Sequence, residues 1–226
     1  MLKIKNMLIV AIAIVSFSTT SFAGSLGLGV TGSFAVVEGS GTEVTEGTET
    51  GDVSVRDATA SNNAVVASIF AEYIFDNNVA IGIDLVPGSA DVNQKDLSRT
   101  DITADAAEAV QDDGKSTAQA TVSNHITLYT EVPVHAGLYG KLGYVEMDVK
   151  TKESSAVTTR GKYGDTKVDG ILYGAGYKND FGSNSYYKVE GTHTQFDTLK
   201  LVSTSTNKIT ADLDVTKLTF ALGYKF

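Results

Sequence analysis

The final segment of the chain, residues 218–226, alternates without exception between apolar side chains and small or polar ones. A period of two puts every second side chain on one face of a β-strand, and here that face is wholly apolar. A soluble protein gains little by ending a strand on an exposed Phe. A strand face that meets lipid gives terminal aromatic residues a physical role at the membrane interface. The apolar positions are Leu218, Phe220, Leu222, Tyr224 and Phe226.

This terminal pattern resembles the last strand of Gram-negative outer-membrane β-barrels, which ends in Phe behind alternating apolar positions. The resemblance implies that Leu218, Phe220, Leu222, Tyr224 and Phe226 are the signal read by the barrel assembly machinery. It also implies a protein of the cell outer membrane, with outer-membrane lipid as a partner.

The start of the chain predicts export. Lys3 and Lys5 precede a short apolar run over residues 7–15, and Ser21-Phe22-Ala23 has the small-x-small form of a cleavage site. Residues 1–23 are therefore expected to be a Sec signal peptide, which leaves 24–226 as one outer-membrane β-barrel domain. The chain has no Cys, so its stability must come from a source other than disulfides, such as a closed hydrogen-bonded barrel.

Seven further segments show strand-like alternation, with their apolar positions on the expected outward face. These segments are 26–36, 64–74, 79–85, 119–132, 138–149, 168–178 and 186–192. On the fourth of them, Val122 is expected to share the outward face with Ile126 and Leu128. After Tyr144 the apolar parity reverses, which either a β-bulge or a strand leaving lipid would explain.

The connections between these strands alternate between long polar segments and short turns. The turns are expected at Phe75–Asn78, Pro133–His135 and Asn179–Asn184, and Pro87-Gly88 is expected to end the third strand. The polar segment 37–63 reads as a mobile acidic loop, and residues 103–110 as a short helix within another loop. This order predicts an all-β, eight-stranded antiparallel up-and-down transmembrane β-barrel. Nearly the whole mature chain then resembles the small barrels that include the OmpA transmembrane domain, OmpX and opacity-type surface proteins.

Charged side chains of both signs fall on the inward face. Because an eight-stranded barrel is only wide enough for side chains to fill it, these charges must pair or be solvated. They form either a structural ion-pair network or the lining of a narrow conduit, and the sequence leaves both open. The predicted lumen network comprises Glu72, Asp84, Glu131, Lys141, Lys188, Glu190 and Lys217.

No catalytic, metal or cofactor site is expected. The three histidines, His125, His135 and His193, show no spacing typical of a catalytic triad. The acidic stretches Asp112-Asp113-Gly114 and Glu43 to Asp52 could suit Ca²⁺, but neither has EF-hand spacing, and a solvated acidic surface is expected instead.

The net charge of −9 opposes nucleic acid as a partner. The expected role is a structural, adhesion or receptor-type surface function of a monomer, through long acidic extracellular loops that contact an extracellular ligand or phage. A small passive channel is the first alternative, and a barrel enzyme is the second.

Overall fold

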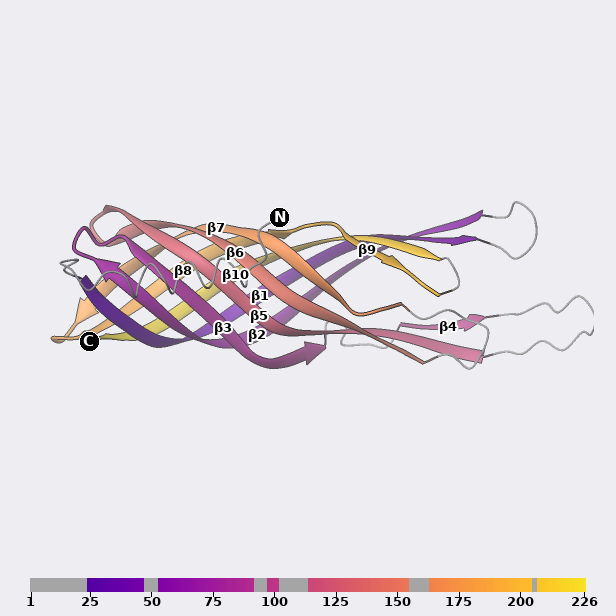
Figure 1. Cartoon of the computed structure of the whole chain (residues 1–226), viewed down its shortest axis with the longest axis horizontal. Coiled ribbons are helices and arrows are strands. Elements are labelled where there is room, and N and C mark those ends of the chain that lie inside the picture. The colour runs from indigo at the N-terminus through magenta and orange to yellow at the C-terminus, as the bar shows by residue number, and fades with distance from the viewer. Residues whose placement is uncertain (1–23, 47–52, 92–96, 102–113, 155–162, 205–206) are drawn as a thin grey trace, which may run out of the picture.

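The computed structural model describes residues 24–46, 53–91, 97–101, 114–154, 163–204 and 207–226. Their regular structure is one antiparallel sheet of ten strands, and eight of these close into a ring because β1 pairs with both β2 and β10 (Figure 1). The predicted all-β, eight-stranded antiparallel barrel is therefore confirmed. None of the described residues belongs to a helix with the length and hydropathy needed to span a membrane. The expected signal peptide, 1–23, lies outside the described residues.

The ring follows chain order. Its strands are β1 (Gly24–Glu46), β2 (Val53–Phe75), β3 (Ala80–Asp91), β5 (Gly114–His135), β6 (Leu138–Ser154), β7 (Thr166–Phe181), β8 (Ser185–Phe196) and β10 (Lys208–Lys225). Two short strands extend the sheet at one end, where β4 (Leu97–Asp101) pairs with β5 and β9 (Leu199–Val202) pairs with β10.

The two ends of the barrel differ. We call the end that holds the short turns at 76–79, 136–137 and 182–184 the turn end, and the opposite end the hairpin end. The expectation of a mobile loop over 37–63 is wrong for the described residues, because β1 and β2 stay paired out to Glu46 opposite Val53. A strand that lies outside lipid needs no apolar face. The polar composition of these parts of β1 and β2 is therefore similar to that of a loop. The expected helix, 103–110, lies outside the described residues.

Two predicted boundaries are wrong because strands continue past a proline. β5 runs through Pro133 to His135, and the turn is Ala136-Gly137, where both residues have positive φ (50° and 84°). This two-residue turn matches the twist of the flanking strands. β3 likewise continues beyond Pro87 to Asp91, with a bulge between Val86 and Ser89.

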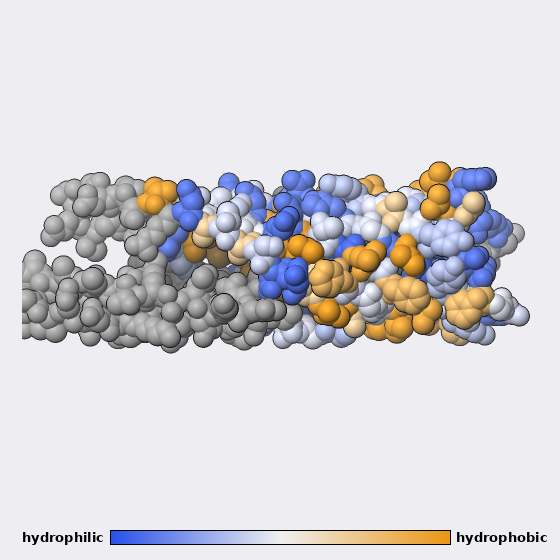
Figure 2. Space-filling view, turned by 180° about the vertical axis from the view of Figure 1, so that it is seen from behind, coloured by the Kyte–Doolittle hydropathy of each residue, from blue (hydrophilic) through white to orange (hydrophobic). Residues whose placement is uncertain are grey.

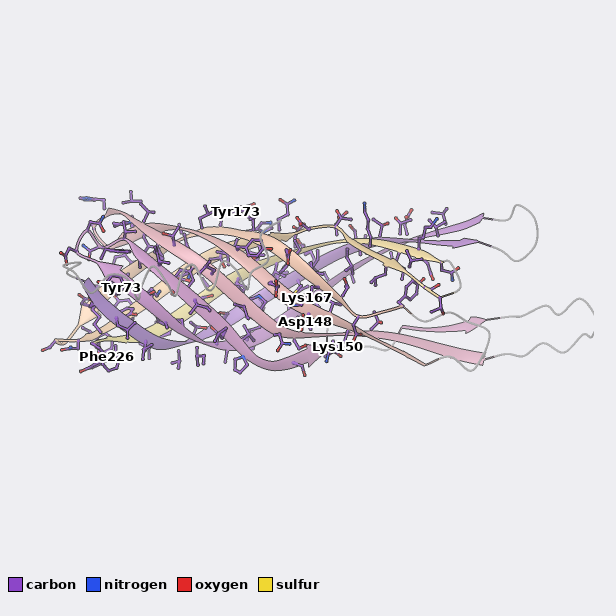
Figure 3. All side chains as sticks on the ribbon, in the orientation of Figure 1. Tyr73, Asp148, Lys150, Lys167, Tyr173 and Phe226 are labelled. Carbon is purple, nitrogen blue, oxygen red and sulfur yellow. The ribbon has the colours of Figure 1, made fainter. Side chains whose placement is uncertain are left out.

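An apolar belt covers the half of the barrel nearer the turn end on the face that Figure 2 shows, and exposed apolar side chains of the other strands, such as Ile81, Leu142 and Ile171, continue it around the ring. Outward side chains of β1 and β10 are exposed there, among them Leu28, Phe34 and Leu222. Aromatic residues border the belt at the turn end, where Tyr224 and Phe226 pack edge to face with ring centroids 5.0 Å apart. Charged side chains border the other side, so that Tyr73 and Phe226 lie toward one border and Asp148, Lys150 and Lys167 toward the other (Figure 3). This is the pattern expected of a barrel that faces lipid.

The terminal strand closes the ring against the first strand, as the shared parity of their apolar faces predicts. Leu28 lies opposite Tyr224, and Phe34 lies opposite Leu218. The backbone N–H of Phe226 donates to the carbonyl oxygen of Leu26 at 2.8 Å.

Strand β6 keeps one parity throughout. Its pairing with β7 has no register shift, and its inward face continues from Tyr139 through Val145 to Val149. Of the two explanations for the sequence reversal, the strand leaving lipid is therefore the correct one for β6. Its inward residues form what we call the apolar plug, a buried cluster inside the barrel toward the hairpin end. The plug consists of Val145, Met147, Val149, Val168, Leu172 and Phe196.

A bulge does occur at this level, but on the neighbouring strand β5. The register of β5 against β6 shifts between Ser123 and Ile126, and Asn124 between them has a positive φ of 53°. The extra residue reverses which side of the sheet the β5 side chains before Asn124 point to. Val122 consequently lies opposite Val149 and packs against the apolar plug, so the expectation that it shares a face with Ile126 is wrong.

Candidate functional site

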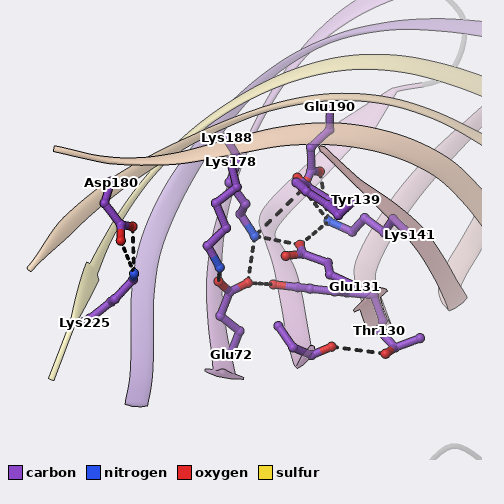
Figure 4. A network of polar contacts seen from close by, with 12 residues as sticks. Glu72, Thr130, Glu131, Tyr139, Lys141, Lys178, Asp180, Lys188, Glu190 and Lys225 are labelled. Atoms are coloured by element: carbon purple, nitrogen blue, oxygen red, sulfur yellow. Dashed lines mark hydrogen bonds and ion pairs between the residues drawn. The ribbon is translucent and has the colours of Figure 1, made fainter. Parts of the chain in front are cut away.

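The interior of the belt contains a cluster of ion pairs centred on Lys188 of β8 (Figure 4). Its Nζ lies 2.7 Å from Glu72 Oε2 and 2.7 Å from Glu131 Oε1, so one ammonium bridges carboxylates from β2 and β5. All three side chains are almost fully buried. Strand parity explains their meeting, since each occupies an inward position at a similar height in the ring.

Lys141 of β6 extends the cluster. Its Nζ donates to both carboxylate oxygens of Glu190, at 2.9 and 2.8 Å, and lies 3.5 Å from Glu131 Oε1. It also lies 3.9 Å from the ring centroid of Tyr129, close enough for a cation–π interaction. Five of the seven predicted lumen residues thus lie in one connected cluster: Glu72, Glu131, Lys141, Lys188 and Glu190.

Two tyrosine hydroxyls also donate hydrogen bonds to carboxylates of the cluster. Tyr129 Oη donates to Glu72 Oε2 at 2.8 Å, and Tyr139 Oη donates to Glu190 Oε1 at 2.6 Å. Each ring lies across a glycine of the neighbouring strand, since a Cβ on Gly82 would stand 2.4 Å from Tyr129 Cζ and one on Gly176 2.5 Å from Tyr139 Cζ. The inward glycines therefore make room for the aromatic rings whose hydroxyls bind the carboxylates.

Lys178 of β7 is a member that sequence reasoning missed. Its Nζ lies 2.9 Å from Glu72 Oε1 and 4.5 Å from the ring centroid of Tyr186. The signal was present, because Lys178 continues the even, inward parity of Leu172 and Gly176. It also lines a cavity of about 310 Å³ at the turn end, and this cavity reaches Glu131. The cluster therefore borders a space that opens toward the turn end.

Among the described residues, Asp84 and Lys217 form no ion pair with the cluster, although Lys141, Lys188 and Glu190 line the same interior cavity as these two residues. Asp84 Oδ2 accepts a hydrogen bond from Ser68 Oγ at 2.6 Å, and Ser68 in turn contacts the hydroxyl of Thr31. Within the part of the chain that the structure describes, Lys217 forms no ion pair within 4 Å. Asp84 and Lys217 line one interior cavity of about 30 Å³, in which about two water molecules fit. Hydration of these two charges is consistent with that volume.

Outside the belt, an exposed charged group lies at the β5 bulge. Lys167 Nζ is 2.8 Å from Glu146 Oε1 and 3.4 Å from Asp148 Oδ1, and its hydrogen bond to Glu146 raises the pKa of Lys167. Asn124 Nδ2 donates to Asp148 Oδ2 at 2.6 Å, and this hydrogen bond lowers the pKa of the Asp148 carboxyl. The bulge thus places a donor on a carboxylate of the next strand.

The histidines do not converge. His193 Nδ1 lies 3.0 Å from Thr216 Oγ1 and its Nε2 lies 3.8 Å from Asp214 Oδ1, while Ser185 stands at the other end of β8. His125 and His135 lie on β5, and the latter ends that strand at the turn. In the described ranges, no group of three or more His, Asp or Glu side chains is arranged to hold a metal ion. Of the acidic stretches, 47–52 and Asp112-Asp113 lie outside the described residues.

The predicted assembly residues face outward on β10 and at Phe226, which directly follows the last residue of that strand. Leu218, Phe220, Leu222, Tyr224 and Phe226 are exposed at the belt, and Phe226 is the most exposed of them at 68%. They are separated in space from the ion cluster, which lies on the inner face of the same ring. The site as a whole can therefore do two things. Its interior fixes charges in a crowded lumen, and its exterior presents an apolar strand face to its surroundings.

Comparison with known proteins agrees with this architecture. The family model described as outer membrane protein beta-barrel domain matches residues 9–226. Similar solved structures include Ail of Yersinia pestis bound to a heparin analogue, at 14% identity and a TM-score of 0.39, covering 86% of this chain and 99% of Ail. OprG of Pseudomonas aeruginosa, at 13% identity and a TM-score of 0.43, is covered over 96% of its length by 90% of this chain.

The outer-membrane protease OmpT of Escherichia coli is also similar, at 13% identity and a TM-score of 0.43, with 92% of this chain and 99% of OmpT covered. No curated protein sequence matches.

Proposed function

The chain belongs to the outer-membrane β-barrel family, and from that premise we propose that it is a surface-interaction protein whose hairpin end makes the functional contacts. In this family the short turns are periplasmic and the long connections are extracellular, so the hairpin end faces the cell exterior. The observation that carries the proposal is the length of the sheet beyond the belt. The pairing of β1 with β10 continues from Phe34, near the belt border, out to Val44 opposite Lys208. Such a paired extension supports an ordered extracellular surface.

The lumen cluster, in this proposal, is a structural core and not a conduit. Lys188 contacts carboxylates that belong to distant strands, and Leu172 and Phe196 of the apolar plug fill the interior toward the hairpin end. A small passive channel is the competing function. Single-channel recording on the reconstituted protein distinguishes the two. Current steps above the membrane leak would show that the lumen conducts and would contradict the structural role.

Hairpin trimming tests the surface function. Replacing residues 40–59 by a two-residue Asn-Gly turn shortens the β1–β2 hairpin to Gly39 opposite Ala60, a little beyond the belt border, and equivalent replacements shorten the other three hairpins. Cells that carry each variant are compared for attachment to epithelial layers and to immobilised serum and matrix proteins. Different gel mobility before and after boiling verifies that each barrel is folded. Attachment should fall with trimming, and unchanged attachment with all four hairpins trimmed would contradict the proposal.

We also propose that the outward face of β10 is the signal for the barrel assembly machinery. The terminal aromatic pair Tyr224 and Phe226 lies at the turn end, where its rings are exposed. Phe226→Ala should lower the amount of heat-modifiable protein in the outer membrane while the purified variant still folds in lipid vesicles. Equal amounts of both proteins in the membrane would remove this role.

A further inference from the structure

The ring is hydrogen-bonded over only part of its height on one side of β2. β2 pairs with β3 from Ile69 to Ile74, whereas it pairs with β1 all the way to Val53. Among the described residues no strand pairs with β2 on its β3 side from Val53 to Ser68. Figure 1 shows β1 and β2 separating from β4 and β5 toward the hairpin end. The outward side chain of Val65, at 85% exposure, agrees with an uncovered neighbour position.

Two bulges at one level explain this separation. On β3, Pro87 has no N–H to donate and Gly88 has a φ of 86°, and the register against β5 shifts between Val86 and Ser89. On β5, Asn124 forms the second bulge directly beside His125, the residue opposite Val86. Since each bulge bends its strand, the β3–β5–β6 part of the sheet turns away from β2.

The two edges that face this gap differ in chemistry. The β3 edge contains Pro87 and a bulge, which are features that prevent a further strand from adding. The β2 edge contains neither, and residues 58–66 carry no charged side chain. Among the strands that the structure describes, the β2 edge therefore remains a template for another strand.

Two hydrogen bonds show which backbone groups of β2 face the gap. The N–H of Asn63 donates to the side-chain Oδ1 of Asn62 at 2.9 Å, and the N–H of Phe75, which has the same parity on β2, donates to the carbonyl oxygen of Val79 on the β3 side. Because N–H groups alternate between the two sides of a strand, those of Thr59 and Ser61 also face the gap. A substitution by Pro at Thr59 or Ser61 can thus remove a backbone N–H that faces the gap without removing one that donates to β1.

The outer surface next to this edge is acidic. A shallow groove of about 320 Å³ crosses β2, β1 and β10, and Thr59, Ala60 and Ser61 form its β2 border. Its charged lining residues are Glu38, Asp212 and Asp214, and no Lys or Arg of the described chain lines it. Glu38 lies opposite both Ser61 and Asp214, which brings the carboxylates within two strands of the edge. A strand added to β2 would lie beside this negative surface.

We propose that the β2 edge binds an extended segment of a partner protein that carries Lys or Arg side chains, by antiparallel addition to the β10–β1–β2 sheet. Main-chain hydrogen bonds to the edge provide affinity, and the acidic groove selects the charge. A second copy in the same membrane fits poorly, because its β2 runs in the same direction and presents the same carboxylates. The proposal rests on the proposed surface function and specifies its partner and its mode of binding.

The test uses the full barrel in lipid nanodiscs and a fluorescent peptide of alternating Lys and Thr, about seven residues long, which spans the edge from Thr59 to Val65 at the belt border. We expect saturable binding by fluorescence anisotropy, with none for the matching Glu-Thr peptide. N-methylation of alternate peptide nitrogens should weaken binding by about tenfold or more. Equal binding of the N-methylated or the Glu-Thr peptide would overturn the proposal.

Variants of the protein locate the site. Ser61→Pro removes a donor that faces the gap and should weaken binding by about tenfold, while Ser61→Ala keeps the donor and should bind normally. The triple variant Glu38→Gln/Asp212→Asn/Asp214→Asn should weaken binding similarly and reduce its salt dependence. All variants are first shown to be heat-modifiable, and the N-methylated peptide tests the edge on unaltered protein. Unchanged affinity in both Ser61→Pro and the triple variant would contradict the site.

The two proposals fail in different ways. If cells attach through the hairpin end but the Lys-Thr peptide does not bind, the edge proposal is wrong and the surface function stands. If trimming all four hairpins leaves attachment unchanged, the surface function is wrong whatever the peptide does.

Discussion

The two halves of this barrel are built on opposite patterns. In the belt half the outward face is apolar, as at Leu142, while Lys188 and its carboxylates fill the interior. In the hairpin half the outward face is polar, as at Asp148, while Val145 and Phe196 fill the interior. β6 belongs to both halves and changes neither parity nor register against β7. The difference shows that the surroundings determine which side chains face inward. Where lipid lies outside, the polar side chains must face the interior, and where water lies outside, the apolar side chains can pack in the interior.

The largest expected loss of stability comes from removing a charge inside the belt half. Lys188→Met leaves Glu72 and Glu131 without their shared ammonium, and removal of one partner of a buried ion pair costs about 3–5 kcal/mol. Reversible urea unfolding in lipid vesicles measures this free energy. Lys188→Met/Glu131→Gln retains the Glu72–Lys178 and Lys141–Glu190 pairs and should recover at least half of the loss. A single variant as stable as the wild type would show that the cluster contributes nothing.

The next effect concerns the hairpin-half interior. Phe196→Ala opens a cavity in the apolar plug and should cost about 3 kcal/mol of unfolding free energy. Phe220→Ala removes the same side chain from the outward face of β10 and should cost less, because no cavity forms in lipid. Equal losses in the two variants would mean that the plug is not a packed core.

A smaller effect locates the boundary between the halves on β6. Leu142→Lys places a charge on the lipid-facing side and should cost about 2 kcal/mol in vesicles. The reverse change at the same face, Lys150→Leu, should leave stability nearly unaltered because that position lies beyond the belt (Figure 3). If both changes have the same cost, the boundary near Tyr144 is misplaced.

The smallest effect is a pH dependence in the hairpin half. The hydrogen bond from Asn124 holds the pKa of Asp148 below its ordinary value, so its stabilisation is present above that ordinary value and is lost as the pH falls through the lowered pKa. Because Asp148 lies at the barrel surface and is partly exposed to water, the contribution should be under about 1 kcal/mol. Asn124→Gly tolerates the positive φ and removes the donor. Carboxyl ¹³C titration should then show the pKa of Asp148 returning upward, and an unmoved titration would exclude this cause.

Sequence periodicity predicts the belt half well, because lipid imposes strict alternation there. The terminal strand, its pairing with β1 and the inward facing of Glu72, Lys188 and Glu190 all follow from parity. It predicts the hairpin half poorly, since strands in water need no apolar outer face and residues 37–46 therefore resemble a loop. Local composition also cannot reveal a bulge such as that at Asn124, which depends on the register of a neighbouring strand. Lys178 could have been found by continuing the parity of β7.

The position of Lys188 has a consequence for how the barrel forms. Its ammonium comes from β8, whereas its carboxylates come from β2 and β5, neither of which is adjacent to β8 in the ring. Glu131 can meet Lys141 as soon as β6 is present and Glu72 can meet Lys178 once β7 is present, but the ammonium that they share arrives only with β8. A barrel that lacks β8 therefore leaves both carboxylates short of one partner, so formation should be cooperative, with the late strands completing the interior.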